Sequence, residues 1–253
     1  MGSNFKSYSL PSFFLLLSLP AFAYGWGFDG HQIICKIAQD RLSESAAAAV
    51  KELLPAYAGD DLSTLCPWAD RIKFRYRWSS ELHYIDTPDD LCTYNYNNNL
   101  TKALLFLSHF MGDIHQPLHV GFTSDRGGNT IDVRWFRRKS VLHSVWDKEI
   151  IETAEDRFYD NVMEEFVDTL KQNITGDWSD QVVKWEKCNN NDVTCPDIYA
   201  SESIKAACNW AYKDVKNNTA LEDDYFLSRL PIVNLRLAES AVRLAVTLNR
   251  IFK

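Results

Sequence analysis

Residues 109–119 read His109-Phe110-Met111-Gly112-Asp113-Ile114-His115-Gln116-Pro117-Leu118-His119. The apolar repeat that leads into this run predicts a helix over 103–114. Because His109 and Asp113 stand four residues apart, both project from one face of that helix. Pro117 cannot continue a helix, and His119 follows it. The stretch therefore places two imidazoles and a carboxylate near one helix end.

A second pair with the same spacing follows, His143 and Asp147. Imidazole nitrogens and carboxylate oxygens are donors that zinc accepts in tetrahedral geometry. A single pair of this kind on a helix is more often a hydrogen-bonded structural pair than a metal site. Two pairs together with His119, all within about forty residues, favour a zinc site.

The N-terminus has the pattern of a secretory signal peptide. Lys6 precedes an apolar run over 13–19, and the small residues Ala21, Ala23 and Gly25 follow. We predict a signal peptide over residues 1–25 and one domain over 26–253. The apolar run is too short for a stable bilayer span, and later segments have fewer than eighteen consecutive apolar residues. The sequence therefore predicts a secreted chain without a membrane anchor.

Six cysteines agree with export, because an even number is typical of disulfides in an oxidising compartment. Their spacing contains no Cys-x-x-Cys pair, which favours disulfides over a metal site but does not fix the pairing. Three acceptor sequons for glycosylation lie at Asn99, Asn173 and Asn217. We expect residence in the secretory pathway, with an extracellular or vacuolar destination.

The chain is acidic, with a formal net charge of −7, and loss of Lys6 with the signal peptide would make it −8. Such a chain is a poor nonspecific duplex binder, because phosphate contacts depend on lysine and arginine. Nucleic acid is not excluded as a substrate, since bound dications would reverse the local field in a carboxylate-rich pocket.

The hydrophobic periodicity indicates a mainly α, single-domain helical bundle with one small β-hairpin. Asp70 lies in a short expected helix, and residues 80–88 alternate as an extended segment. A turn at Gly127-Gly128 leads into a strand-like alternation up to Trp135, where we expect the small hairpin. The longer expected helices cover 32–42, 46–54, 103–114, 150–158, 162–170, 180–185, 200–212 and 231–252. Ser43 is placed to cap the second of these, and Pro55 to end it.

Three isolated ligand candidates, His31, Asp70 and His83, lie upstream, and each alone is more often a hydrogen-bonded structural residue. Their surroundings are informative: Trp26-Gly27-x-x-Gly30-His31, Trp68-Ala69-Asp70, Leu82-His83-Tyr84-Ile85-Asp86-Thr87-Pro88, Gly112-Asp113-Ile114-His115-Gln116-Pro117-Leu118-His119-Val120-Gly121, Gly127-Gly128-Asn129-Thr130, Val145-Trp146-Asp147 and 223–231. With these motifs, residues 26–253 resemble the zinc-dependent single-strand-specific nucleases of plants and fungi, often called bifunctional nucleases. The plant branch is the more similar.

The resemblance implies a phospholipase C/nuclease-type fold that holds three Zn²⁺ ions. It assigns Asp70, His83, His109 and Asp113 to the first ion, and His119, His143 and Asp147 to the second. The third would take His31, a second oxygen of Asp113, and the amino group and carbonyl oxygen of Trp26. An amino group at Trp26 requires signal cleavage after Gly25, although the small residues also permit a cut after Ala23. His115 is left as a structural or supporting residue.

The resemblance also implies roles in handling substrate. Asp86 matches the position that orients the attacking water, although a strand-end cap is the alternative. Asn129 matches a base-contacting amide, and Tyr84 is a candidate for stacking on a base, which contributes about 1–3 kcal/mol per base without strict sequence choice. Lys73 is a candidate phosphate contact or, alternatively, a solvated helix charge. The resemblance pairs Cys35 with Cys66, Cys92 with Cys208, and Cys188 with Cys195.

One departure from the family is visible. The interval from Cys92 to His109 is shorter than in similar nucleases, which carry an extra cysteine pair there.

We expect a monomeric endonuclease that cuts RNA and single-stranded DNA to 5′-phosphorylated products and has 3′-nucleotidase activity. Two alternatives are a phospholipase C-like zinc phosphodiesterase and a metal-binding glycoprotein whose catalysis the shortened interval has impaired.

Overall fold

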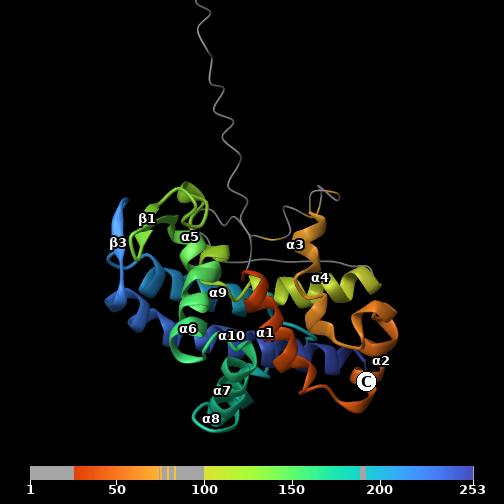
Figure 1. The fold of residues 1–253 in the computed structure, drawn as a ribbon. Coiled ribbons are helices and arrows are strands. Elements are labelled where there is room, and N and C mark those ends of the chain that lie inside the picture. Colours follow the sequence, from red (N-terminus) through yellow and green to blue (C-terminus); the bar gives the residue numbers. More distant parts are fainter. Residues whose placement is uncertain are drawn as a thin grey trace, which may run out of the picture.

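The computed structural model describes residues 26–73, 75, 79, 83, 100–188 and 192–252, without the side chains of 100–103. This part of the chain is mainly helical, as expected (Figure 1). Its α-helices are α1 (Phe28–Gln39), α2 (Glu44–Leu53), α3 (Trp68–Ile72), α4 (Leu100–Asp113), α5 (Leu142–Ser144), α6 (Ile150–Phe158), α7 (Met163–Thr175), α8 (Ser179–Trp185), α9 (Pro196–Ala206) and α10 (Asp223–Ile251). Short 3-10 turns include η4 (Pro117–Val120), and π-helical turns are η6 (Val145–Glu149) and η8 (Ala207–Ala211).

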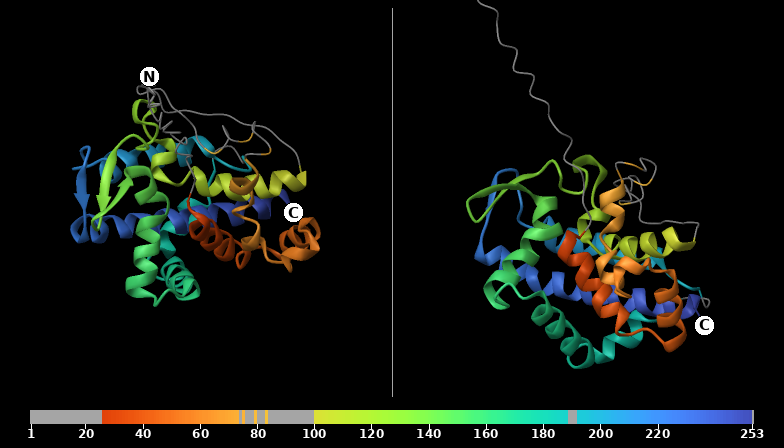
Figure 2. Two further views of the ribbon diagram at one scale, coloured as in Figure 1. Left: turned by 45° about the horizontal axis from the view of Figure 1, so that its top comes forward. Right: turned by 45° about the vertical axis from the view of Figure 1, so that its right-hand side comes forward.

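The long helix α10 forms the middle of the bundle, and α1, α2, α4, α6, α7 and α8 all contact it (Figures 1 and 2). Every residue from Leu237 to Ala245 is buried, since neighbours cover this helix on several sides. Helix α1 lies against both α10 and α4. Gly112 permits this approach, because a Cβ there would lie 2.9 Å from His31 Nδ1. The close approach brings His31 towards the face of α4 that carries His109 and Asp113.

A small sheet lies at one end of the bundle (Figure 1). Strands β1 (Asp132–Trp135) and β2 (Arg138–Val141) form the expected hairpin, with Arg134 opposite Lys139 in the antiparallel register. A third strand, β3 (Thr219–Leu221), pairs parallel to β1 and was not predicted. Val133 and Trp135 are buried, so one face of the hairpin packs on the core.

Several helix boundaries differ from the expectation. Helix α6 agrees to the residue, and Ser43 accepts the capping hydrogen bond from Ala46 N at the start of α2. The prediction that a helix begins at Pro231 was wrong, because α10 begins at Asp223 and contains Pro231. A proline inside a helix costs about 3 kcal/mol. Burial of Tyr225 and Phe226 in the turns before it offsets that cost.

Two expected disulfides are present, Cys35–Cys66 and Cys188–Cys195. The first links α1 to the segment before α3, and so fastens two of the elements that carry ligand candidates. Cys92 lies outside the described residues, so its pairing with Cys208 stays a prediction. Among the described helices, none combines the length and the apolar character that a bilayer span requires.

Candidate metal centre

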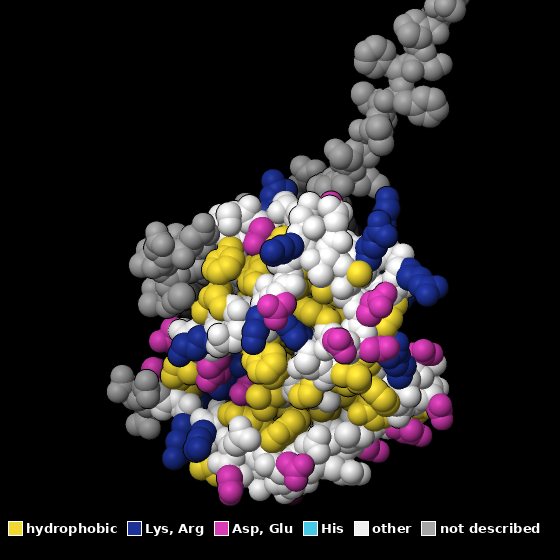
Figure 3. Space-filling model, turned by 90° about the vertical axis from the view of Figure 1, so that its left-hand side faces the viewer, with side chains coloured by type: hydrophobic (Ala, Val, Ile, Leu, Met, Phe, Trp, Pro, Cys, Tyr) yellow, Lys and Arg dark blue, Asp and Glu magenta, His cyan; other side chains and the backbone are white. Residues whose placement is uncertain are grey.

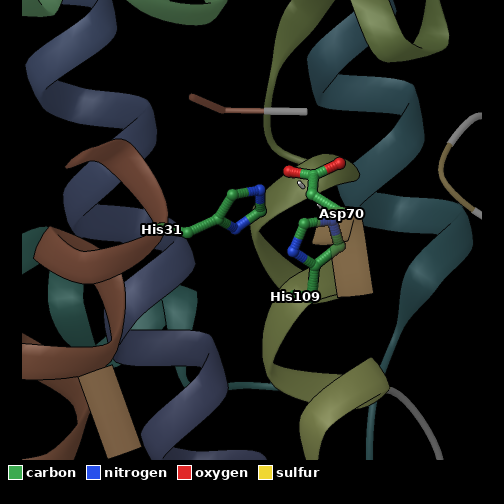
Figure 4. A group of neighbouring side chains, drawn as sticks. All are labelled: His31, Asp70 and His109. Carbon is green, nitrogen blue, oxygen red and sulfur yellow. Dashed lines mark ion pairs between the residues drawn. The ribbon is translucent and has the colours of Figure 1, made fainter. Parts of the chain in front are cut away.

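Buried histidines and aspartates from α1, α3 and α4 converge beside the point where α1 crosses α4. His31, Asp70 and His109 offer ligand atoms that all lie within 4.8 Å of one another (Figure 4). The rings of His31 and His109 stack with their centroids 3.8 Å apart. His83, His109 and Asp113 form a second such group, in which His109 Nε2 lies 2.9 Å from His83 Nδ1 and 3.2 Å from Asp113 Oδ2.

His119, His143 and Asp147 form the third group. His143 Nε2 lies 3.3 Å from Asp147 Oδ2, and His119 Nε2 lies 3.5 Å from Asp147 Oδ1. Asp147 lies in the π-helical turn η6, a local widening that is frequent at functional sites. His119 Nδ1 also lies 3.8 Å from Asp113 Oδ1, so Asp113 connects this group to the first two.

The residues present suit divalent metal ions. Both ring nitrogens of His31, Nε2 of His83 and both carboxylate oxygens of Asp113 are buried, and they make no geometrically acceptable hydrogen bond within the described chain. Buried polar atoms without hydrogen bonds are costly, and metal ligands are a recognised exception. Each group combines imidazole nitrogens with a carboxylate, which is a donor set that transition metals accept. Three buried groups in this chain can therefore hold metal ions.

Several ring nitrogens are oriented by backbone carbonyls. His109 Nδ1 lies 3.1 Å from Cys66 O, His119 Nδ1 lies 2.8 Å from His83 O, and His143 Nδ1 lies 2.6 Å from Gly127 O. As an N–H at Nδ1 donates to the carbonyl, the lone pair is left on Nε2. All three Nε2 atoms then point towards carboxylates of the groups. This is the tautomer that a metal ligand requires.

Burial and mutual charge shape the protonation of the site. Burial lowers the pKa of His31 to about 4, and the neighbouring His109 acts in the same direction. Burial alone would raise the pKa of Asp113, but His109 and His119 outweigh it and hold that pKa well below its usual range. His31 is thus neutral and Asp113 ionised at neutral pH, as metal ligation demands.

The remaining sequence-predicted residues occupy varied positions. Lys73 is 3 % exposed and its Nζ lies 3.1 Å from Asp70 Oδ1, which excludes the alternative of a solvated charge. Asn129 is half-buried, and its amide donates to Arg126 O at 2.8 Å. Trp26 is fully buried, and the amide of the adjacent Gly27 donates to Asp147 O at 2.7 Å. Tyr84 and Asp86 lie outside the described residues.

Sequence reasoning missed Gln116. Its side-chain amide donates to Asp147 Oδ1 at 2.5 Å, while its Oε1 accepts the backbone N–H of Leu118 at 2.5 Å. Its place between His115 and Pro117, inside the stretch that carries the ligand candidates, was the available signal. His115 itself faces α10: Nδ1 lies 2.7 Å from Met111 O, and Nε2 lies 2.9 Å from Arg243 Nη1.

Comparison with known proteins agrees with this arrangement. The sequence profile of the family described as S1/P1 Nuclease matches residues 26–102 and 93–253. Endonuclease 2 of Arabidopsis thaliana is 56% identical, over 90% of this chain and 91% of that protein. Nuclease S1 of Aspergillus oryzae is 28% identical, over 96% of this chain and 97% of that protein. Nuclease P1 of Penicillium citrinum is 27% identical, over 89% and 97%.

The two parts of the profile match meet at residues 93–102, inside the interval between Cys92 and His109 that the sequence indicates to be short. The alignment with Endonuclease 2 runs over 266 positions, more than the 253 residues of this chain, so it includes positions that only the relative fills. The matched profile, the plant and fungal relatives and the three buried histidine–aspartate groups agree, and the chain belongs to the S1/P1 nuclease family.

Proposed function

We propose that this chain is a zinc-dependent endonuclease that hydrolyses RNA and single-stranded DNA to 5′-phosphorylated products and has 3′-nucleotidase activity. The observation that carries the proposal is the set of buried His31, His83 and Asp113 atoms that lack hydrogen bonds. In a nuclease family, such atoms are best explained as ligands of metal ions that act on phosphodiester bonds. Soft nitrogen donors with few carboxylates favour zinc over magnesium or calcium.

Three Zn²⁺ ions would be held by the ligand sets that the resemblance implies. Asp70, His83, His109 and Asp113 would bind one, and His119, His143 and Asp147 another. His31, Asp113 and the amino group and carbonyl oxygen of Trp26 would bind the third. Bound zinc acidifies water and stabilises the negative charge that develops on phosphate oxygens. The distance of 3.4 Å between His31 Nε2 and Asp113 Oδ1 supports a shared ion there.

The chain's own residues orient the reactants. Asp86 would accept a proton from the attacking water and hold it towards phosphorus, opposite the departing 3′ oxygen. Tyr84 would stack on an unpaired base, and Asn129 would contact a base edge through Oδ1 and its second N–H, since the first donates to Arg126 O. Lys73, 3.1 Å from Asp70, would add a positive charge beside the phosphate.

Maturation is part of the proposal. Removal of residues 1–25 would free the amino group of Trp26, so export would complete the site. Secretion to the extracellular space or vacuole also fits the two disulfides and the sequons. Asn217 is exposed, and its Oδ1 accepts from Asp132 N, which leaves Nδ2 available for a glycan. Asn173 is half-buried on α7, and Asn99 lies outside the described residues.

The test is an activity and metal assay on the secreted protein. RNA, single-stranded DNA and a 3′-mononucleotide should be hydrolysed, chelation should abolish hydrolysis, and Zn²⁺ should restore it. Elemental analysis should find three zinc ions per chain, and mass spectrometry should find Trp26 at the N-terminus. Release of phosphocholine from lipid without nucleotide release would favour the phosphodiesterase alternative. Bound zinc without any hydrolysis would indicate the impaired glycoprotein.

A further inference from the structure

A strongly basic hairpin stands out on this acidic chain. Residues 134–139 read Arg134-Trp135-Phe136-Arg137-Arg138-Lys139, four cations and no acid in six residues, although the formal net charge of the chain is −7. We name these four side chains, Arg134, Arg137, Arg138 and Lys139, the basic hairpin. All four are exposed. None takes part in an ion pair seen within the described residues.

The four cations of the basic hairpin destabilise the sheet by mutual repulsion. Arg134 and Lys139 are directly opposed in the β1–β2 register, and like charges at such positions destabilise a sheet. They share the outer face, since Val133 and Trp135 point into the core. Asp132, on the same face, and Glu149, which interacts with Arg138, offset only part of the charge. Nothing in the packing of the hairpin requires four cations, so a polyanionic partner is the simplest explanation.

The hairpin is fixed to the candidate metal centre. Strand β2 ends at Val141, two residues before His143, and the amides of Leu142 and His143 donate to Ile131 O and Gly128 O. Lys139 is four residues from His143, so their Cα atoms lie at most about 14 Å apart. The sheet lies at the end of the molecule that Figure 3 views, where Lys and Arg side chains project from the upper part of the surface.

We propose that the basic hairpin binds the phosphates of a single-stranded polynucleotide beyond the bond that is cut. This inference rests on the proposed nuclease function and adds a binding track to it. Exposed cations contact backbone phosphates without reading sequence. The track would favour long strands over dinucleotides, because only a long strand reaches both the metal centre and the hairpin.

The test compares two double variants with equal charge change. Arg134→Gln/Lys139→Gln removes the opposed cations, and Lys184→Gln/Lys187→Gln removes two exposed lysines in and just after α8, which lies at the bottom of Figure 1, away from the sheet. On a thirty-nucleotide single strand, the hairpin variant should show KM raised roughly tenfold with kcat unchanged. Its KM on a dinucleotide should equal that of the wild type. The slope of log(kcat/KM) against log salt should become shallower by about 1.4, at 0.7 for each lost phosphate contact.

Binding is measured separately, with a hydrolysis-resistant phosphorothioate single strand and with vesicles of anionic lipid. Weaker binding of the single strand by the hairpin variant alone supports the track, even if the wild type cleaves nothing, in which case only the nuclease proposal fails. Equal KM values for the wild type and the hairpin variant on the long strand overturn the track. A KM raised equally on the dinucleotide and on the long strand also overturns it. So does an equal rise of KM on the long strand in the Lys184/Lys187 variant. Hairpin-dependent binding of vesicles without binding of the single strand would assign the surface to a membrane instead.

Discussion

Gln116 Nε2 donates to Asp147 Oδ1 at 2.5 Å, and both side chains are buried. The bond joins the turn between α4 and η4 to η6, and therefore links the segment between Asp113 and His119 to the turn that carries Asp147. Because Gln116 Oε1 is held by Leu118 N, the amide can present only its N–H groups to the carboxylate. Gln116 thus fixes which oxygen of Asp147 remains for His119 and which for His143.

Replacing Gln116 by methionine should weaken the group formed by His119, His143 and Asp147. Loss of a partner that orients a ligand typically costs about 10–100-fold in metal affinity. We expect one zinc per chain to be lost first when the variant is dialysed against a graded competitor, with two retained. Gln181→Met, on the exposed face of α8, is the control and should keep the wild-type zinc content. Unchanged retention in Gln116→Met would show that Asp147 needs no such support.

Two glycines with nearly equal backbone geometry allow a matched comparison. Gly127 has φ +60° and Gly59 has φ +62°, so alanine is strained at both. A Cβ at Gly127 would lie 2.1 Å from Leu118 O, whereas nothing lies within 4 Å of a Cβ at Gly59. Gly59→Ala should lower the unfolding free energy by about 1 kcal/mol.

Gly127→Ala should lower the unfolding free energy clearly more than Gly59→Ala does. It should also displace the Gly127 carbonyl, which accepts from His143 Nδ1. Thermal unfolding monitored by circular dichroism gives the first difference, and zinc content gives the second. Equal midpoints for the two variants would mean that the turn around Gly127 relaxes without effect on Leu118.

Local patterns in the sequence predicted the helices and the hairpin, but not how distant segments meet. The end of α6 was predicted because its amphipathic repeat stops at Phe158, whereas its start at Ile150 is only a change from the π-helical turn η6 to α-helix. Strand β3 was missed, since three residues are too short to show alternation and its pairing with β1 is set by the fold. The start of α10 was misplaced because proline normally ends or begins a helix.

The same limit applies to the site. The spacing of His109 and Asp113, and of His143 and Asp147, identified ligand pairs on single helices. His31 and His83 could be added only through the family resemblance, because nothing in their local sequence indicates that they face α4. The contact of Gln116 could not be predicted for the same reason, since its partner Asp147 is 31 residues away along the chain; only its place among the ligand candidates pointed to it.

Arg243 anchors the opposite side of the turn that carries the ligands. Its Nη1 lies 2.9 Å from His115 Nε2, and its guanidinium bonds Glu202 and lies over the Tyr199 ring at 4.4 Å. Breaking a buried charge pair costs about 3–5 kcal/mol, so Arg243→Met should lower the unfolding free energy by about 3 kcal/mol, since Glu202 is partly exposed. Arg250→Met should lower the unfolding free energy by less than Arg243→Met does. It removes only hydrogen bonds to Val193 O and Glu186 O nearer the end of α10. Urea unfolding of both variants measures the difference, and equal losses would contradict it.

The surroundings of Glu155 predict that the unfolding free energy of the chain falls as pH rises. The residue is 9 % exposed, its Oε1 has no hydrogen bond within the described chain, and Asp29, Glu152 and Glu164 surround it from α1, α6 and α7. Burial, followed by repulsion from these carboxylates, raises the pKa of Glu155 to about 7, against 4.5 for an ordinary glutamate. Lys36 pairs with Glu164 at 3.1 Å and relieves part of the repulsion.

The sign follows from the proton that the folded chain retains. In the unfolded chain Glu155 ionises near pH 4.5, whereas the folded chain keeps its proton until about pH 7. The unfolding free energy therefore decreases between these two values, and the full cost is present above pH 7. Glu155→Gln should unfold several degrees higher than the wild type at pH 8 and at nearly the same temperature at pH 4. Glu165→Gln, on the exposed face of α7, should match the wild type at both. A gain for Glu155→Gln of equal size at pH 4 and pH 8 would mean that the carboxyl is ionised throughout, and that its surroundings do not hold the proton.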